Sequence, residues 1–273
     1  MQYDPIKKSL GKVFNRTPFL RVLFYRLLDL LLLRSWYVKR EIRKWANGKG
    51  GRRDTNCTLL DAGSGFGQYS YFMSGLSPFW AIQAVDVKEE QVEDCNRFFT
   101  QIHRRNVLFE TADLTHFNKP DKFDLILSVD VMEHIAEDDT VFRNFYDSLT
   151  QHGMLLISTP SDQGGSDVHD HEEGSSFIDE HVRDGYNIGE ICKKLARAGF
   201  IKTEAYYSYG KPGQVAWRLS MKYPILLINA SRIFFLLLPF YYLVAWPVAL
   251  LLNSLDLKFH HTTGTGLIVK AWK

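Results

Sequence analysis

Apolar residues follow two alternating patterns along the middle of the chain. Short apolar runs with the composition of strands alternate with longer stretches in which apolar residues recur at helical spacing. The predicted strands are CTLLDAG, WAIQAVDV, NVLFETA, FDLILSVD, GMLLISTP, FIKTEAYYSY and GLIVKAWK. The predicted helices are QYSYFMSGL, EEQVEDCNRFFTQI, DTVFRNFYDSLT and YNIGEICKKLARAGF. This alternation predicts an α/β protein with a doubly wound, Rossmann-like sheet covered by helices.

Ahead of the first strand, residues 19–45 have the pattern of one long basic amphipathic helix. Its apolar side chains share a narrow stripe on a helical wheel: Phe24, Leu27, Leu31, Val38, Ile42 and Trp45. Basic residues fill the rest of the surface, so the helix either lies along an anionic membrane or packs its stripe on the domain. Asn47–Asn56 contains three glycines and predicts a linker. No signal peptide is expected, because Leu27–Leu33 follows two arginines and lacks a cleavage site.

Length and composition narrow the class. A chain of 273 residues suits one domain with an insertion, and a net charge of +2 gives no general affinity for nucleic acid, so no nucleic-acid partner is expected. The three cysteines, Cys57, Cys95 and Cys192, are odd in number and far apart. They argue against a disulfide framework or a zinc site and favour buried thiols in a reducing cytoplasm.

Candidate chemistry gathers where the predicted strands end. LLDAGSGFGQ (Leu59–Gln68) places three glycines directly after an apolar strand, where a bare backbone approaches a ligand closely. The spacing is G-x-G-x-G with an acid two residues ahead, which matches a dinucleotide less well than G-x-G-x-x-G. The second strand ends at Asp86, where a carboxylate can accept both hydroxyl protons of an adenosine ribose. The third ends at Asp113, and the fourth ends in LSVDVMEHI.

In this order, the four stretches resemble the class I S-adenosylmethionine-dependent methyltransferases, and most closely the quinone-biosynthesis and related small-molecule subgroup. The resemblance covers about residues 57–210 and the final strand. It implies S-adenosyl-L-methionine as cofactor and S-adenosyl-L-homocysteine as product. It also implies these cofactor-binding positions: Asp61, Ala62, Gly63, Ser64, Gly65, Gly67, Asp86, Val87, Asp113, Leu114, Ser128, Val129 and Asp130.

The methyl group of this cofactor sits on a cationic sulfur, so the enzyme chiefly aligns an acceptor and excludes water. A hydroxyl or carbon acceptor also needs a base, for which the resemblance suggests His134 and, in FIDEHVRDGY, His181. Either histidine has a structural interpretation too. His169 and His171 lie in a polar, glycine-rich loop, Ser161–Ser176, which is a plausible lid. A solvated loop explains them as well as metal binding does, and no metal site is assigned.

A long apolar region lies before the last strand. Ile233–Leu252 is almost wholly apolar, Tyr223–Leu238 is a shorter apolar run, and Pro239 separates two arms of about fourteen to sixteen residues. In the methyltransferase fold the last two strands are an antiparallel pair, so a single membrane span would place the final strand on the wrong side. The sequence favours a re-entrant or interfacial hairpin, with Tyr241 and Tyr242 among its aromatic residues in the headgroup layer. A lid or dimer interface is the alternative.

The resulting expectation is a doubly wound methyltransferase with an antiparallel last strand, an N-terminal helix and an apolar helical insertion. The four expected regions are a basic helical segment (1–50), the cofactor-binding catalytic domain (51–210), the hairpin (211–260) and the last strand (261–273). The expected acceptor is a hydrophobic or lipid-linked small molecule, with oxygen on a quinone precursor or phenol favoured. The membrane surface is expected to contact residues 19–45 and 223–252, on the cytoplasmic side, as for a peripheral or monotopic protein.

Other functions remain open. The acceptor is alternatively a lipid-linked sugar, a polyene pigment precursor or a soluble small molecule. From a different class, the chain is an inactive cofactor-binding partner in a membrane assembly. A nicotinamide-dependent oxidoreductase is the third class, against which the glycine spacing and Asp113 speak.

Overall fold

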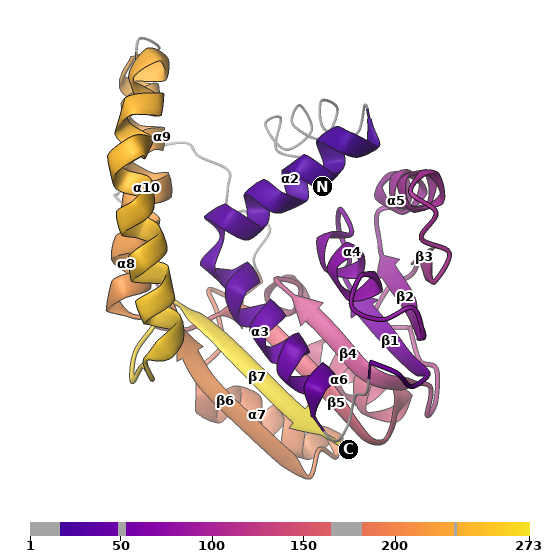
Figure 1. The fold of residues 1–273 in the computed structure, drawn as a ribbon. Coiled ribbons are helices and arrows are strands. Elements are labelled where there is room, and N and C mark those ends of the chain that lie inside the picture. Colours follow the sequence, from indigo (N-terminus) through magenta and orange to yellow (C-terminus); the bar gives the residue numbers. More distant parts are fainter. Residues whose placement is uncertain (1–16, 49–52, 165–181, 232–233) are drawn as a thin grey trace.

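The computed structural model describes residues 17–48, 53–164, 182–231 and 234–273. A seven-stranded sheet of order β3-β2-β1-β4-β5-β7-β6 forms its centre (Figure 1). The strands are β1 (Cys57–Ala62), β2 (Trp80–Asp86), β3 (Val107–Thr111), β4 (Phe123–Val129), β5 (Leu149–Pro160), β6 (Lys202–Ser208) and β7 (Gly266–Trp272). Strand β7 runs antiparallel to both of its neighbours, and β1 to β5 pair in parallel. The predicted fold class is confirmed.

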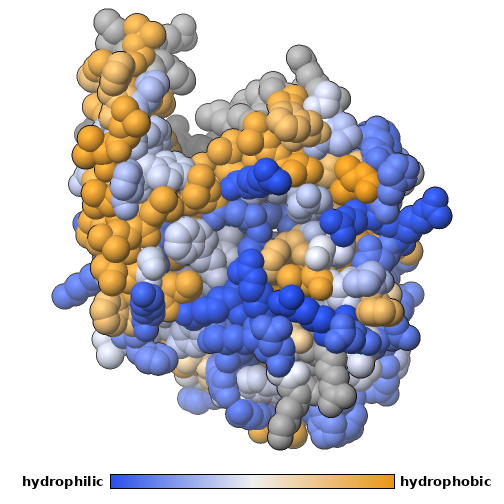
Figure 2. All heavy atoms as spheres, viewed as in Figure 1, coloured by the Kyte–Doolittle hydropathy of each residue, from blue (hydrophilic) through white to orange (hydrophobic). Residues whose placement is uncertain are grey.

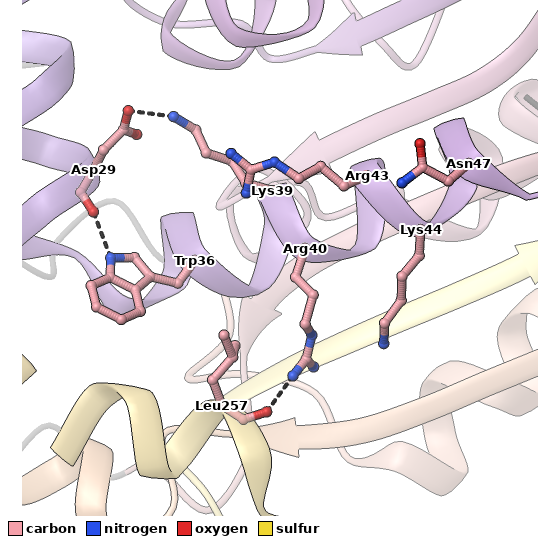
Figure 3. A pocket seen from close by; sticks show the side chains of 8 residues that line it. All are labelled: Asp29, Trp36, Lys39, Arg40, Arg43, Lys44, Asn47 and Leu257. Carbon is pink, nitrogen blue, oxygen red and sulfur yellow. Dashed lines mark hydrogen bonds and ion pairs between the residues drawn. The ribbon is translucent and has the colours of Figure 1, made fainter. Parts of the chain in front are cut away.

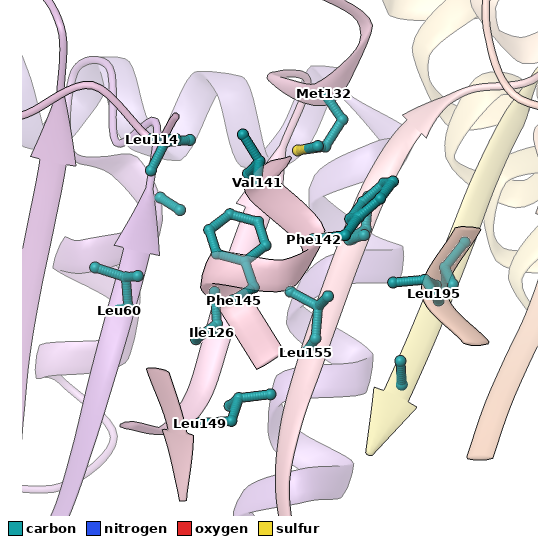
Figure 4. Packing of buried hydrophobic residues seen from close by; sticks show 14 of the residues in the cluster. Leu60, Leu114, Ile126, Met132, Val141, Phe142, Phe145, Leu149, Leu155 and Leu195 are labelled. Carbon is teal, nitrogen blue, oxygen red and sulfur yellow. The ribbon is translucent and has the colours of Figure 1, made fainter. Parts of the chain in front are cut away.

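Helices cover both faces of the sheet because successive strand residues point to opposite sides. Leu60, Ile126 and Leu155 face α6 (Asp138–Ser148) and α7 (Ile188–Ala198) in one buried cluster (Figure 4). Their neighbours Leu59 and Leu125 belong to a second cluster, on the side of α3 (Leu33–Asn47) and α4 (Gln68–Ser74). Helix α5 (Glu89–Gln101) packs with β2 and β3.

The N-terminal segment forms two helices, α2 (Pro18–Leu31) and α3, so the prediction of one helix over residues 19–45 is wrong. Leu32 is extended, with φ −100° and ψ 107°, and separates them. The apolar stripe is correct for α3, which buries Val38 and Ile42 on the sheet. In α2 the buried residues are instead Arg21 and Tyr25, because polar contacts of the Arg21 side chain compensate for its burial.

A buried carboxyl joins β1 to the helix that follows. Asp61 is 2% exposed and accepts a hydrogen bond of 2.6 Å from the hydroxyl of Ser70 in α4. Burial raises the pKa of Asp61 to about 6, because the charged form is poorly solvated. Asp61 therefore positions α4 directly behind the glycine loop.

A helical hairpin fills the chain between β6 and β7 and projects away from the sheet (Figure 1). Its first arm joins α8 (Lys211–Trp217), a π-helix η2 (Arg218–Lys222) and α9 (Tyr223–Ala230) without a break. Its second arm is α10 (Phe234–Lys258), 25 residues and roughly 38 Å long.

The position of the turn and the lengths of the two arms differ from those predicted from the sequence. Pro239 and Pro247 lie inside α10, and the first arm ends at Ala230, before an extended Ser231. Both prolines remove a backbone donor, but the rest of the helical ladder continues around them. Each arm is thus longer than the sequence pattern predicted. Leu236–Lys258 is long and apolar enough to cross a membrane by length and composition, and 17% of its most apolar window is buried.

The two arms are tied by tyrosines. The Tyr241 hydroxyl donates to the carbonyl oxygen of Leu219 at 2.6 Å, and that of Tyr242 donates to the carbonyl oxygen of Ser220 at 2.9 Å. Both carbonyls belong to the π-helix. Both hydroxyls are used between the arms, and the expectation that these aromatic residues lie in a headgroup layer stays a prediction.

The base of the hairpin is anchored to α3 by a fully buried carboxylate. Asp256 accepts hydrogen bonds from the Tyr37 hydroxyl at 2.7 Å and from the Gly213 amide at 2.9 Å. A Cβ atom on Gly213 would lie 2.8 Å from the same carboxylate. Tyr37 is in α3, so this cluster holds both arms against the sheet domain.

We predict that Asp61 makes stability depend on pH. The folded state holds its proton up to a pKa of about 6, against an ordinary value of 3.8. The contribution of this group to the free energy of unfolding is therefore complete below about pH 4 and is lost as pH rises through about 6. Asp61→Asn keeps an acceptor for Ser70 but does not titrate. Urea unfolding should show the stability of the wild type relative to the variant falling by about 3 kcal/mol between about pH 4 and 7. Parallel profiles for the two proteins would contradict the assignment.

Candidate active site

The glycine loop turns at the carboxyl end of β1 and contacts β2 through its backbone. The amides of Gly63 and Ser64 donate to the carbonyl oxygen of Val85 at 2.8 and 2.9 Å. Gly63 has φ 80°, and a Cβ atom there would lie 2.2 Å from the side chain of Val131. A Cβ atom on Gly65 would meet nothing within 4 Å. The loop thus packs tightly on one side and borders open space at Gly65.

Asp86 lies beside this loop at the end of β2. One carboxylate oxygen accepts the Gly65 amide at 2.8 Å, and the other accepts the Lys88 amide at 3.0 Å. Each oxygen retains a further acceptor site. The next residue, Val87, is 54% exposed and presents an apolar side chain at the same edge. The pair offers a charged acceptor beside an apolar surface.

Asp113 and Leu114 follow β3, and their side chains lie in different environments. The Asp113 carboxylate accepts the amide and hydroxyl of Thr115, and these hydrogen bonds lower the pKa of Asp113. Leu114 is 4% exposed and packs in the core below β1 and β4. Any recognition of a ligand at this position therefore falls to Asp113 and to backbone groups.

Two buried hydroxyls lack hydrogen-bond partners where β1 and β4 end. Ser128 in β4 pairs with Ala62 across the strands, and Ser64 follows Ala62 by two residues. The Oγ atoms of Ser64 and Ser128 are both buried without a partner. Buried polar groups in proteins are rarely left unpaired, so unsatisfied hydroxyls at a strand edge favour a polar ligand there.

Beyond Ser128 and Val129 the chain reaches Asp130 in a left-handed conformation, with φ 51°. Its carboxylate forms an ion pair with Arg34 from the first turn of α3. The Arg34 backbone amide donates a hydrogen bond of 2.9 Å to the hydroxyl of Tyr209, the residue after β6. The Nε atom of Arg34 is buried without a partner. Arg34 brings a positive charge to the edge that carries Ser128.

Sequence reasoning missed Arg34, which it placed on the basic surface of a helix. No local pattern marks it, because its contact with Asp130 depends on how α3 crosses the sheet. Helix α2 also reaches this region: the Arg21 guanidinium donates to the carbonyl oxygen of Phe66 at 2.9 Å, inside the glycine loop. The N-terminal helices therefore form part of the candidate site.

The two predicted catalytic histidines are placed unequally. His134 ends the short helix η1 (Met132–His134), is exposed, and donates its amide to the carbonyl oxygen of Val131 at 3.0 Å. It lies four residues beyond Asp130, close in sequence to the candidate edge. His181, His169 and His171 lie outside the described residues. Within the described ranges, His, Cys, Asp and Glu side chains form no group of three suited to a metal.

Comparisons with known proteins agree with this geometry. A family model described as a methyltransferase domain matches residues 53–204, more than half of the chain. A phosphoethanolamine N-methyltransferase of Triticum aestivum is 35% identical over 95 residues, which are 34% of this chain and 18% of that protein. A malonyl-[acyl-carrier protein] O-methyltransferase of Bacillus anthracis is 25% identical over 116 residues, 42% of each protein. The chain thus spans less than half the length of these curated relatives.

Solved structures share the fold. Phosphoethanolamine N-methyltransferase 2 of Haemonchus contortus, solved with S-adenosyl-L-methionine, aligns over 87% of this chain and 52% of that one, with a TM-score of 0.60 and 19% identity. An S-adenosylmethionine-dependent methyltransferase of Mesorhizobium loti aligns over 88% of this chain and 98% of that one, with a TM-score of 0.52 and 15% identity. These matches do not support the narrower likeness to quinone-biosynthesis enzymes. Together with the family match and the sheet order, they show that the chain belongs to the methyltransferase domain family.

Proposed function

We propose that the chain binds S-adenosyl-L-methionine and transfers its methyl group to a hydrophobic or lipid-linked small molecule at a membrane surface. The observation that carries the proposal is the edge formed by the glycine loop, Asp86 and the unsatisfied hydroxyls of Ser64 and Ser128. This edge supplies acceptors, donors and open backbone within one region. A nicotinamide nucleotide is the competing ligand, and its failure to displace the cofactor would exclude it.

The residues at the edge fit the parts of this cofactor. Asp86 retains acceptor sites for ribose hydroxyls, and exposed Val87 offers an apolar surface to adenine. We expect Asp113 to accept a hydrogen bond from the adenine amino group. Ser64 and Ser128 supply hydroxyls for the polar methionine end. When bound, the cofactor would supply a methyl group activated by a sulfonium, and the chain would chiefly hold the acceptor in line and exclude water.

Oxygen on a quinone precursor or another phenol remains the favoured acceptor within this proposal. Such a hydroxyl must lose its proton, and His134 is the described candidate for the base because η1 directly follows the β4 edge. A phosphorylated amine is the second candidate, as suggested by the phosphoethanolamine N-methyltransferases among the relatives. Arg34 favours it, since a guanidinium at this edge suits a phosphate.

We also propose that the hairpin and α2 attach the enzyme to the cytoplasmic face of a membrane. The exposed side chains of the hairpin include Leu236, Phe240, Leu243 and Val244, each at least 68% exposed. Figure 2 shows the apolar residues of the hairpin and α2 as one band on this face. An exposed apolar surface of this kind is typical of a lipid or protein contact. Because nearly all of α10 is apolar, a lipid layer fits it better than water.

The first test measures the chemistry. Purified full-length protein is incubated with radiolabelled S-adenosyl-L-methionine and with lipid and soluble fractions of host extract. We expect label in the lipid fraction. Asp86→Asn should weaken cofactor binding roughly 10- to 100-fold in calorimetry, because a charged acceptor worth about 1.5–3 kcal/mol is lost. Asp54→Asn, at an exposed position away from the edge, is the matched control.

Each outcome of this test separates the alternatives. Label only in the soluble fraction keeps the methyltransferase and rejects the lipidic acceptor. Cofactor binding without methyl transfer to either fraction would favour the alternative that the chain is an inactive assembly protein. Equal binding by the two variants would contradict the role of Asp86.

The second test measures the membrane contact. Phe240→Ser with Leu243→Ser should leave the melting temperature unchanged, because both side chains are exposed and stabilise little of the fold. The same pair should reduce flotation with zwitterionic vesicles at least tenfold, since burying one such side chain is worth about 1.5–3 kcal/mol. Two exposed residues away from the band, Phe79→Ser with Ile201→Ser, form the control. Unchanged flotation of the hairpin variant would reject the membrane proposal.

A further inference from the structure

A basic pocket lies along α3, beside the last turns of α10 (Figure 3). It has a volume of about 500 Å³. Four cationic side chains, Lys39, Arg40, Arg43 and Lys44, line it with a single carboxylate, Asp29. Neither the proposed methyl transfer nor cofactor binding uses this cluster.

The pocket keeps positive charge after its internal ion pairs are made. Lys39 pairs with Asp29, and Arg40 and Lys44 both pair with Glu41, which is 2% exposed beneath them. Lys270 contacts the same glutamate at 3.4 Å, so Glu41 is already shared among three cations. Across the part of the chain that the structure describes, Arg43 forms no ion pair; its guanidinium lies 4.9 Å from the Phe72 ring centre. The pocket therefore presents donors suited to an added anion.

The pocket lies beside the base of the hairpin. Leu257, at the end of α10, forms one wall, and its carbonyl oxygen accepts a hydrogen bond from Arg40. The pocket thus lies where the apolar hairpin joins the sheet domain. The exposed apolar residues of α2, Phe19, Leu23, Leu27 and Leu30, continue the same band. Figure 2 shows hydrophilic residues lying below this band. Trp36 also lines the pocket, and its indole donates to the Asp29 carbonyl oxygen at 2.6 Å.

We propose that this pocket binds the phosphate of an anionic phospholipid headgroup while the apolar band enters the acyl layer. The inference rests on the membrane contact proposed above and adds its lipid specificity. Guanidinium groups bind phosphate through paired hydrogen bonds, and cations next to an inserted apolar segment meet the headgroup layer. A free phosphate ester has the same chemistry; we favour the lipid phosphate because α10, which exposes apolar side chains, contributes one wall of the pocket.

The test compares flotation with phosphatidylcholine vesicles and with vesicles that also contain phosphatidylglycerol. Binding to phosphatidylcholine vesicles measures the contribution of the hairpin. The increase in binding when phosphatidylglycerol is added measures the contribution of the pocket. Arg43→Gln should reduce that increase about fivefold, and Arg43→Gln with Lys44→Gln about twentyfold. Arg143→Gln with Lys193→Gln removes the same charge from exposed positions on α6 and α7 and should leave the increase within about twofold. Binding of S-adenosyl-L-methionine by each variant monitors the fold and the cofactor edge.

Four results would overturn the proposal. An equal loss in the pocket and control variants would show a general charge effect. Wild-type protein that binds both vesicles equally would show that no headgroup is recognised. Displacement from phosphatidylglycerol vesicles by glycerol phosphate at concentrations matched to the lipid would identify a soluble anion as the occupant. Failure to bind either vesicle would reject the membrane contact itself, which is distinct from loss of the increase alone.

Discussion

The antiparallel insertion of β7 between β5 and β6 is the constraint on which the outer part of the molecule depends. Ser208, the last residue of β6, pairs with Gly266, the first of β7, so the chain must return to the point where it left. The exit and return also touch: a Cβ atom on Gly210 would lie 2.1 Å from the ring of His261. The segment between β6 and β7 must therefore leave the sheet and return to the same place. A two-armed hairpin satisfies this condition with its backbone hydrogen bonds made internally.

The N-terminal helices connect this outer part to the cofactor edge. Helix α3 carries Arg34 to Asp130 at one end and holds Asp256 of the hairpin through Tyr37. Helix α2 reaches the glycine loop through Arg21. The break at Leu32 lets the two helices take different directions while remaining adjacent in sequence. One short segment therefore contacts the edge, the hairpin and the basic pocket, and this places the proposed membrane contact next to the proposed chemistry.

The sheet could be predicted because its strands are short apolar runs between turn-forming residues, and the glycine loop and Asp86 could be predicted because they occupy strand ends. Long-range contacts could not. The sequence pattern put Arg21 and Arg34 on the basic surface of a helix, yet their burial or pairing depends on residues far away in the chain. Pro239 read as a helix boundary, but a proline removes only one hydrogen bond from a ladder that its neighbours sustain. The local sequence pattern predicts helices, strands and turns, but it does not predict which faces of those elements pack together.

The two tyrosine hydroxyls between the arms have a mechanical consequence. Tyr241 and Tyr242 occupy the carbonyl oxygens of Leu219 and Ser220, beside a π-helix whose widened turn interrupts the regular ladder. Sliding α10 by one turn along the first arm would break both bonds together and strand their polar atoms among apolar side chains. The arms are thus locked in one register. The length of α10 beyond these two bonds is therefore fixed relative to the first arm, and with it the distance between the hairpin tip and the sheet.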